Sequence, residues 1–343
     1  MQEISSRILV DGKVVDFMNA SYKNSGGVTA AQLTVTIPGE DVSYRKYWGK
    51  EMIAYLNEED TYPFFRGYIM DTTIENDYGM RLVGLDALGW LTGHQKAIVF
   101  VDDLSNIDGY TVGGALKKLI SLANLDNYVG TDYIGDTSPV ITIRNNIRGE
   151  IVILDWLKKV LPQALDNTTN IDLPRENTLV VRDDGVKGQL NIELVSDLDV
   201  SPPVYSFNIN NIIDYKVKAR KIPTTIAVRG RGVTGKYRNE SAALAYGENF
   251  KTLSNNNLES PADCIEFARK AFYANVKNQY EITLSSYDGA YVMPNDIISI
   301  NVDETDISNN YRVVGKDVTF DNNKYSVTLN INRRPPLLSD FLI

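Results

Sequence analysis

The feature of this sequence that most constrains its fold is a period-two alternation of apolar and polar residues in its first and last thirds. From Ala31 to Ile37 every second residue is apolar, and the alternation stops at Pro38-Gly39. A period of two is that of a strand with one buried face. Because such stretches recur, we predict that residues 4–107 and 204–343 each form a barrel-like antiparallel sheet.

The individual strands follow from the same pattern. In the first third they are Ile8–Val10, Lys13–Val15, Ala31–Ile37, Glu51–Asn57, Phe64–Glu75 and Met80–Leu85. In the last third they are Asp214–Lys221, Thr224–Arg229, Tyr280–Tyr287, Asp296–Val302, Tyr311–Val318 and Lys324–Asn332. Asp11-Gly12 is a two-residue hairpin signal. One helix interrupts the later strands: Ser260 is its cap, Pro261 its first residue, and it runs to about Lys277.

The middle of the chain has a different periodicity and predicts a small α+β module. Its predicted elements are helices at Thr111–Leu125 and Gly149–Leu165, a strand at Val140–Arg144, and a hairpin of Leu179–Val181 with Gln189–Val195. Ser201-Pro202-Pro203 breaks regular structure where the charge balance also changes. We therefore predict a mainly β (α+β) chain with domains at 1–107, 108–203 and 204–343.

Composition excludes several classes of protein. Hydrophobic residues make up 43% and charged residues 23%, which is ordinary for a globular chain. The longest apolar run, Ala97–Val101, is far below the roughly 18 residues of a membrane-spanning helix, and the N-terminal residues predict no export signal. With only Cys264 and His94, the chain predicts no intramolecular disulfide and no His/Cys zinc site. We expect assembly in a reducing cytoplasm, with Cys264 packed as a small hydrophobe.

The net charge of −9 argues against a nucleic-acid coat and against sequence-specific nucleic-acid binding. The charge is unevenly distributed: residues 1–107 carry −6, residues 108–203 carry −5, and residues 204–343 carry +2.

The segment from Gly230 to Tyr237 matches two glycine-rich motifs, G-x-G-x-x-G and G-x-x-x-x-G-K. A phosphate loop needs a Ser or Thr after its lysine to coordinate magnesium, and Tyr237 stands there instead. A helix should also begin at once, inside an alternating βα pattern that this region lacks. We therefore interpret the motif as a glycine-bearing loop between strands and predict that it binds no nucleotide.

Other catalytic patterns are weaker. No G-x-S-x-G occurs, and His94 follows Gly93 in a polar break that indicates a surface turn. The adjacent carboxylates Asp183 and Asp184 belong to a predicted hairpin turn, and the acidic loop Asp303–Asp306 lacks calcium-loop spacing. We predict no catalytic residues, no bound metal and no cofactor.

A run of bases gives the first candidate interface. In the predicted strand Asp214–Lys221, the side chains of Lys216, Lys218 and Arg220 share one face, opposite Tyr215 and Val217. This face is either a solvated surface that discourages edge pairing or a docking surface for an acidic neighbour, such as another copy's first domain.

The C-terminal segment gives the second candidate interface. After Pro335-Pro336, five of the last seven residues are large and apolar: Leu337, Leu338, Phe341, Leu342 and Ile343. In water they would form an adhesive patch. They either fold back on their own domain or dock on a neighbouring subunit or another partner protein.

Several short motifs, in order along nearly the whole chain, resemble the baseplate hub proteins of tailed bacteriophages, relatives of late-control protein D and of the N-terminal half of type VI secretion spikes. They are Trp48-Gly49-Lys50, the strand Glu51–Leu56, Pro63–Ile69, Gly84–Leu91, Tyr110–Leu116, Met293–Ile298 and Tyr311–Val314. One departure is Asn295 in place of the family's usual glycine in a turn, although Asn also tolerates a left-handed backbone.

The resemblance implies a structural protein of the virion tail with two tail-tube-like β-barrels per chain. Family members assemble as homotrimers whose six barrels form a pseudo-sixfold ring. The implied partners are the tail tube or distal tail protein, the tape-measure protein, the spike and baseplate wedge proteins. Because no polar spike or lysozyme module follows Ile343, we expect any such module to be a separate chain.

Two other functions remain open at this point. The 20 tyrosines and 3 tryptophans would suit sugar stacking in a tail-associated lysin that degrades cell walls. A nucleotide-dependent motor has only the glycine motif in its favour. Lytic activity of the purified chain, or a tape-measure gene upstream, would discriminate between the candidates.

Overall fold

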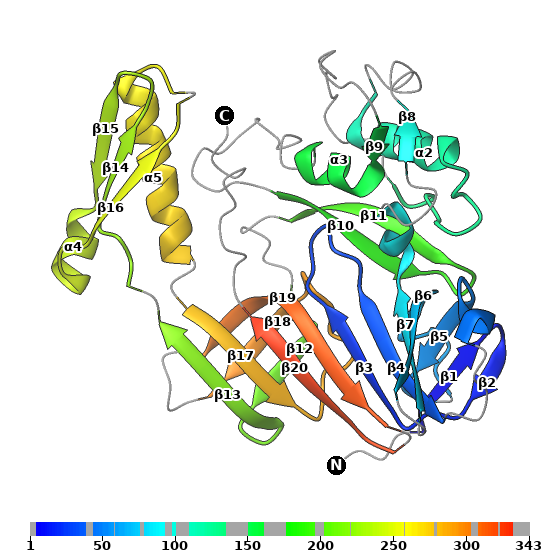
Figure 1. Cartoon of the computed structure of the whole chain (residues 1–343). Coiled ribbons are helices and arrows are strands. Elements are labelled where there is room, and N and C mark those ends of the chain that lie inside the picture. Colours follow the sequence, from blue (N-terminus) through cyan, green and yellow to red (C-terminus); the bar gives the residue numbers. More distant parts are fainter. Residues whose placement is uncertain are drawn as a thin grey trace. The chain divides into compact units, whose positions relative to one another are not determined.

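A computed structural model of the chain contains two compact units (Figure 1). Unit 1 comprises Met1–Asp214 and Ser285–Leu329, and unit 2 comprises Tyr215–Leu284 and Asn330–Ile343. The structure describes residues 5–38, 44–57, 59–75, 79–92, 98–100, 110–134, 150–160, 176–195, 202–219, 221–256, 258–277, 280–302, 308–321 and 323–331. The three-part division into residues 1–107, 108–203 and 204–343 stays a prediction.

The main sheet of unit 1 combines strands from both ends of the chain. Its strands are β1 (Arg7–Val10), β2 (Lys13–Val15), β3 (Asn19–Asn24), β4 (Gln32–Pro38), β5 (Glu51–Tyr55), β6 (Phe65–Glu75), β7 (Gly79–Leu85), β19 (Asn309–Phe320) and β20 (Tyr325–Ile331). They lie in the order β20-β19-β3-β4-β7-β6-β5-β1-β2. The η1 turn (Tyr44–Tyr47) precedes β5, and β12 (Tyr205–Asn208) and β18 (Ile297–Asn301) extend from β19.

The predicted first hairpin is confirmed. Strands β1 and β2 pair antiparallel with Ile8 opposite Val15, and Asp11 and Gly12 form the turn with φ of 52° and 74°. A two-residue hairpin turn that matches the twist of its strands requires positive φ at both residues. Asp and Gly tolerate such values, so an Asp-Gly pair predicts this turn.

Pairing of β3 with β19 joins the N-terminal and C-terminal strands. Lys316 lies opposite Asn24, and the antiparallel register continues to Phe320 opposite Ala20. The rings of Phe64 and Phe320 meet edge to face at 6.1 Å, so both ends of the chain contribute to one core. The strand β3 was absent from the sequence prediction because its residues, Asn19 to Asn24, include two asparagines and one lysine.

The α+β part of unit 1 packs on this sheet around its own apolar core. Its elements are η3 (Ala87–Leu91), β8 (Ile98–Phe100), α2 (Val112–Leu122), β9 (Glu150–Val152), α3 (Ile153–Val160), β10 (Glu176–Asp183) and β11 (Gly188–Val195). The core includes Leu116 and Leu119 of α2, Leu157 of α3 and Leu190 of β11. The Thr111 side chain caps α2 by accepting a hydrogen bond from the amide of Gly114.

The second predicted helix is wrong at its start. Residues Glu150–Val152 form a strand, β9, that pairs antiparallel with β8, and α3 begins only at Ile153. The β-branched Ile151 and Val152 favour a strand once a partner strand is available. The predicted strand Val140–Arg144 lies outside the described residues.

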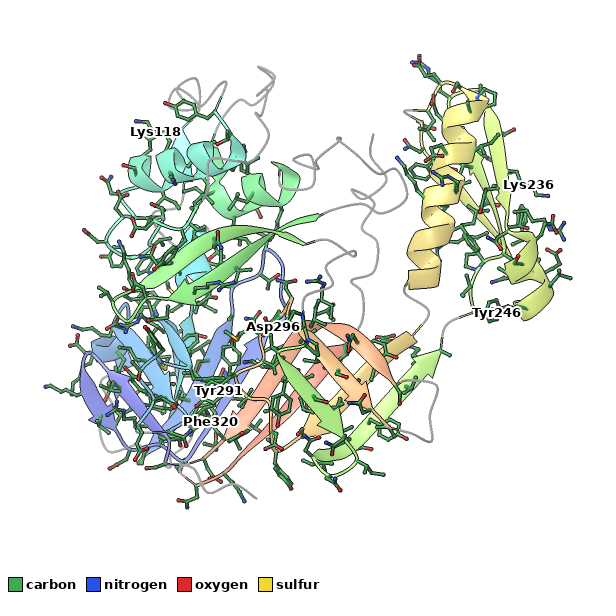
Figure 2. All side chains as sticks on the ribbon, turned by 180° about the vertical axis from the view of Figure 1, so that it is seen from behind. Lys118, Lys236, Tyr246, Tyr291, Asp296 and Phe320 are labelled. Carbon is green, nitrogen blue, oxygen red and sulfur yellow. The ribbon has the colours of Figure 1, made fainter. Side chains whose placement is uncertain are left out.

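Unit 2 is a small sheet covered by one helix (Figures 1 and 2). Its own elements are β14 (Thr225–Arg229), β15 (Thr234–Arg238), α4 (Glu240–Tyr246), β16 (Phe250–Ser254) and α5 (Pro261–Lys277). Strands β15, β14 and β16 form the small sheet. Strands β13 (Ile212–Ala219) and β17 (Tyr280–Ser286) cross the unit boundary, pair with each other and continue the main sheet beyond β20. The predicted helix is confirmed, since Ser260 Oγ accepts from the amide of Asp263 at the start of α5.

The predicted fold class is confirmed: the described chain consists mostly of antiparallel sheets with few helices. Among the described strands, β12 pairs parallel with β18 and β14 pairs parallel with β16, and local alternation did not predict this direction. Alternation reports that a strand has one buried face but not the direction of its neighbour.

Candidate docking surface and unit 1 pocket

The predicted basic strand exists as β13. The side chains of Lys216 and Lys218 are exposed, as expected from their positions in the alternation. The opposite face is also open to solvent, because Ile213 is 48% exposed and Tyr215 is 39% exposed. The ammonium of Lys218 lies 3.9 Å from a carboxylate oxygen of Glu281, and such an exposed pair adds little stability. β13 is therefore a strand with an accessible basic face and an accessible apolar face.

The remaining predicted interface residues lie outside the described residues. They are Arg220 at the end of the basic strand, and Leu337, Leu338, Phe341, Leu342 and Ile343 in the C-terminal segment. Their assignment to an interface stays a prediction.

The glycine motif forms the hairpin between β14 and β15, which confirms its interpretation as a loop between strands. The amide of Gly230 donates to the carbonyl of Val233 at 2.8 Å, and Gly232 has a φ of 73°. A strand follows the loop, so the residues after it do not present a helix N-terminus to a phosphate. Lys236 lies within that strand and is exposed.

Close packing of α5 explains two of these glycines. A Cβ on Gly235 would lie 2.6 Å from Cys264 Cβ, and one on Gly230 would lie 2.4 Å from the carbonyl oxygen of Leu258. The hairpin and the helix can approach only because both positions lack a side chain. Cys264 is fully buried at this contact, as predicted for a small packed hydrophobe.

The other residues that the sequence offered for catalysis or metal binding either stabilise a turn or lie outside the described residues. His94 and the acidic loop Asp303–Asp306 lie outside the described residues. Asp184 lies in the turn between β10 and β11, where hydrogen bonds from the Lys187 amide and the Gln189 side chain lower its pKa to about 2. Within the part of the chain that the structure describes, no group of three His, Cys, Asp or Glu residues is arranged to hold a metal.

Arg66 on β6 connects the main sheet to the β10–β11 hairpin. Its guanidinium donates to Asp183 Oδ2 at 2.6 Å, to Glu51 Oε1 at 2.7 Å and to the carbonyl of Gly185 at 2.9 Å. Burial alone would lower the pKa of Arg66, but the bonds to Glu51 and Asp183 outweigh it and raise the pKa. Asp183 is therefore one partner in an ion pair that fixes the hairpin.

Unit 1 also contains a pocket of about 570 Å³. The polar part of its wall includes Tyr22, Asn24, Arg66, Asp86, Asp183, Asp296 and Arg312. Hydrogen bonds to the main chain engage several of these groups: Arg312 donates to the carbonyl of Asn295 at 2.7 Å, and Asp296 accepts from the amide of Met293 at 2.8 Å. These bonds hold the turn around Asn295, whose φ of 80° lies in the left-handed region that Asn tolerates better than most residues.

Asp86 is a buried carboxylate at this pocket. It caps η3 by accepting from the amide of Leu88 at 3.1 Å. Burial raises the pKa of Asp86 to about 7, although its backbone hydrogen bonds act in the opposite direction. In the sequence, Asp86 stands out only as part of the segment Gly84–Leu91, because no local pattern distinguishes a buried aspartate cap from an exposed one.

Lys316 is a buried lysine near the same pocket. Its ammonium donates to the carbonyl of Ala290 at 2.7 Å, and it lies 4.8 Å from the ring centroid of Phe64 and 5.1 Å from that of Tyr22. Burial lowers the pKa of Lys316 to about 7. A signal was present in the sequence, since Lys316 is in phase with the buried Val318 and Phe320 on β19.

Structural comparison places this fold among known proteins, whereas comparison with family models and with curated sequences finds no match. A tail protein from Neisseria meningitidis MC58 superposes with a TM-score of 0.63 at 14% identity, covering 98% of both chains. A 43 kDa prophage MuSo2 tail protein from Shewanella oneidensis gives 0.63 at 9% identity, covering 96% of this chain and 97% of that one. The chain has the fold of phage tail proteins.

A third structure extends the likeness to secretion machinery. An Escherichia coli component of the type VI secretion system, described as similar to bacteriophage T4 tail proteins, gives a TM-score of 0.53 at 10% identity. The match covers 95% of this chain and 76% of that one. These neighbours agree with the hub-like resemblance seen in the sequence motifs. Among the described helices, none has the length and apolar character needed to cross a membrane.

Proposed function

We propose that this chain is a structural protein of a phage tail or of a phage-tail-like injection machine, and that it is located in the tail or baseplate of the particle. The observation that carries the proposal is the superposition on a phage tail protein over 98% of both chains. A match of that extent includes the sheets and the α+β part together, so it is not limited to one domain that many unrelated proteins share.

The finer proposal is a baseplate hub. In it, three copies close a ring that joins the tail tube to a central spike, with the tape-measure protein above and distal tail or wedge proteins around it. The motifs from Trp48 to Val314 support it, and so does a type VI secretion component among the structural neighbours. Head-to-tail contacts between copies give closed rings when the rotation closes.

A role without catalysis agrees with the geometry. Three polar groups inside unit 1 have structural contacts: Arg66 bonds Asp183, Asp86 caps η3, and Lys316 bonds a carbonyl. The functional neighbours in this proposal are therefore other proteins, bound through surfaces of the chain.

Native mass spectrometry tests the proposal, on the purified chain alone and after co-expression with the proteins encoded beside it. We expect a species of three copies, alone or with those partners, and a ring in electron micrographs. A chain that stays monomeric with its tail partners present would contradict the hub. Hydrolysis of cell-wall substrate by the purified chain would instead favour the lysin.

A further inference from the structure

Residues 215–284, which make up most of unit 2, carry a charge opposite to that of the rest of the chain. They contain twelve lysines and arginines against six aspartates and glutamates, a net charge of +6. The remaining residues carry 23 bases and 38 acids, a net charge of −15. Such segregation of charge sets up an attraction between copies of one chain.

The three-stranded sheet of unit 2 has one covered face. Ile226 and Val228 of β14 and Leu253 of β16 pack with the buried residues of α5. Because direction alternates along each strand, the residues between them point to the other side. Figure 2 shows Lys236 of β15 on the side of the sheet away from α5.

Strand register identifies the residues of this open side. On the central strand β14, Ala227 lies beside Lys236 of β15 and Thr252 of β16, Arg229 lies beside Thr234 and Ser254, and Thr225 lies beside Arg238 and Phe250. The cations Arg229, Lys236 and Arg238 are exposed, and Phe250 is 61% exposed. We call these four residues the basic sheet face. The adjoining α4 adds Leu244, which is 88% exposed, and Tyr246, which is 54% exposed.

The composition of this face favours a protein partner over nucleic acid. Arg238 already forms ion pairs with the carboxylates of Glu240 and Glu248 at its edge, and these acids would repel a phosphate backbone. Exposed Phe250, Tyr246 and Leu244 provide apolar and aromatic contact area of the kind found in protein interfaces.

We propose that the basic sheet face docks on the acidic unit 1 of a second copy of this chain. This inference rests on the proposed function, because a ring of copies requires contacts between different surfaces of successive subunits. Charge complementarity would orient the two copies, and the exposed aromatic and apolar side chains would be buried between them. The open side of the sheet would then become covered, as its other side already is by α5.

The test is charge reversal on the basic sheet face in the full chain, with the double variant Arg229→Glu with Lys236→Glu. The matched control is Lys251→Glu with Lys270→Glu, which makes the same charge change in unit 2, with Lys251 paired beside the core residue Ile226 and Lys270 on α5. Sedimentation velocity would measure self-association at low and high salt, and circular dichroism would establish that each variant is folded.

We expect the face variant to weaken self-association at least about tenfold at low salt, and by less at high salt, where exposed charges are screened. The control should assemble like the wild type. Equal loss in both variants, or unchanged assembly of the face variant, would overturn the inference while leaving the hub proposal intact.

Two further outcomes are distinguishable. If the face variant assembles normally but loses binding to a fluorescent DNA duplex, the face is a nucleic-acid site and the inference is wrong. If the wild-type chain stays monomeric with its tail partners, the hub proposal fails together with the inference.

Discussion

Lys316 and Asp86 are two buried ionisable residues of opposite sign whose pKa values both lie near 7. Burial lowers the pKa of Lys316 from 10.5 to about 7 and raises that of Asp86 from 3.8 to about 7. Burial removes water from the charged form of each side chain, and a hydrogen bond holds each in place: Lys316 bonds the carbonyl of Ala290, and Asp86 caps η3. Both residues therefore make the stability of unit 1 depend on pH, with opposite signs.

The Lys316 contribution should increase the free energy of unfolding with pH. Between pH 7 and about 10.5 the unfolded chain holds a proton on this amine that the folded chain lacks, so stability rises through that window. We expect the difference between wild type and Lys316→Met to rise by up to about 5 kcal/mol, measured by chemical denaturation at several pH values.

The Asp86 contribution should decrease the free energy of unfolding with pH. Between about pH 4 and 7 the folded chain holds a proton on this carboxyl that the unfolded chain has released, so stability falls through that window. The Asp86→Asn variant should remove up to about 4 kcal/mol of this fall while its side-chain oxygen still accepts from Leu88. A difference between wild type and variant that is independent of pH would contradict the assignment.

At the scale of elements, the β14–β15 hairpin and α5 explain why a glycine motif occurs in a chain of this fold. The helix begins beside the hairpin: a Cβ on Gly235 would collide with Cys264 and Ile265 of α5, and one on Gly230 would collide with the carbonyl of Leu258 just before the helix. The motif that resembles a phosphate loop is therefore a packing feature of the sheet and its covering helix.

A Gly235→Ala substitution should destabilise unit 2. Its Cβ would lie 2.6 Å from both Cys264 Cβ and the amide nitrogen of Ile265, so the helix must move away from the sheet. We expect a loss of about 2 kcal/mol in unfolding free energy, as for other overpacked sites. The neighbouring Thr234→Ala, at an exposed position, should cost no more than about 0.5 kcal/mol. If the two substitutions lowered the melting temperature equally, the contact between Gly235 and α5 would not be tight.

At the scale of the whole molecule, the proposed function depends on surfaces that bind other subunits and tail proteins. The basic face of β13 is accessible, and we expect Lys216→Glu with Lys218→Glu to weaken subunit or partner association in a salt-dependent way. Analytical ultracentrifugation of the variant with its tail partners would measure this. Unchanged assembly, together with a salt-sensitive loss of DNA binding, would reverse the assignment.

The C-terminal segment offers a second assembly prediction. Deleting Leu337 to Ile343 should leave the melting temperature of the monomer nearly unchanged but impair ring formation or spike attachment, because these apolar residues are expected to bind another subunit. Differential scanning calorimetry and native mass spectrometry would be read together. A large drop in monomer stability with intact assembly would place the segment in the chain's own core.

The sequence by itself determined the local elements with strong periodicity or turn chemistry. Asp11-Gly12 predicted the first hairpin, Ser260 and Pro261 predicted the start of α5, and the Ala31–Ile37 alternation predicted β4. The candidate residues Lys216 and Lys218 were correctly placed on an exposed strand face. These signals are readable because caps, turns and alternation depend on residues only a few positions apart.

Only the tertiary structure decided how those elements combine. It paired β3 with β19 across nearly the whole length of the chain, converted Glu150–Val152 from predicted helix to strand, and buried Lys316 beneath the rings of Tyr22 and Phe64. It also placed Arg229, Lys236 and Arg238 together on the open side of a sheet and left Gly235 under a helix. Each outcome depends on contacts between residues distant in sequence, and such contacts leave no local period to read.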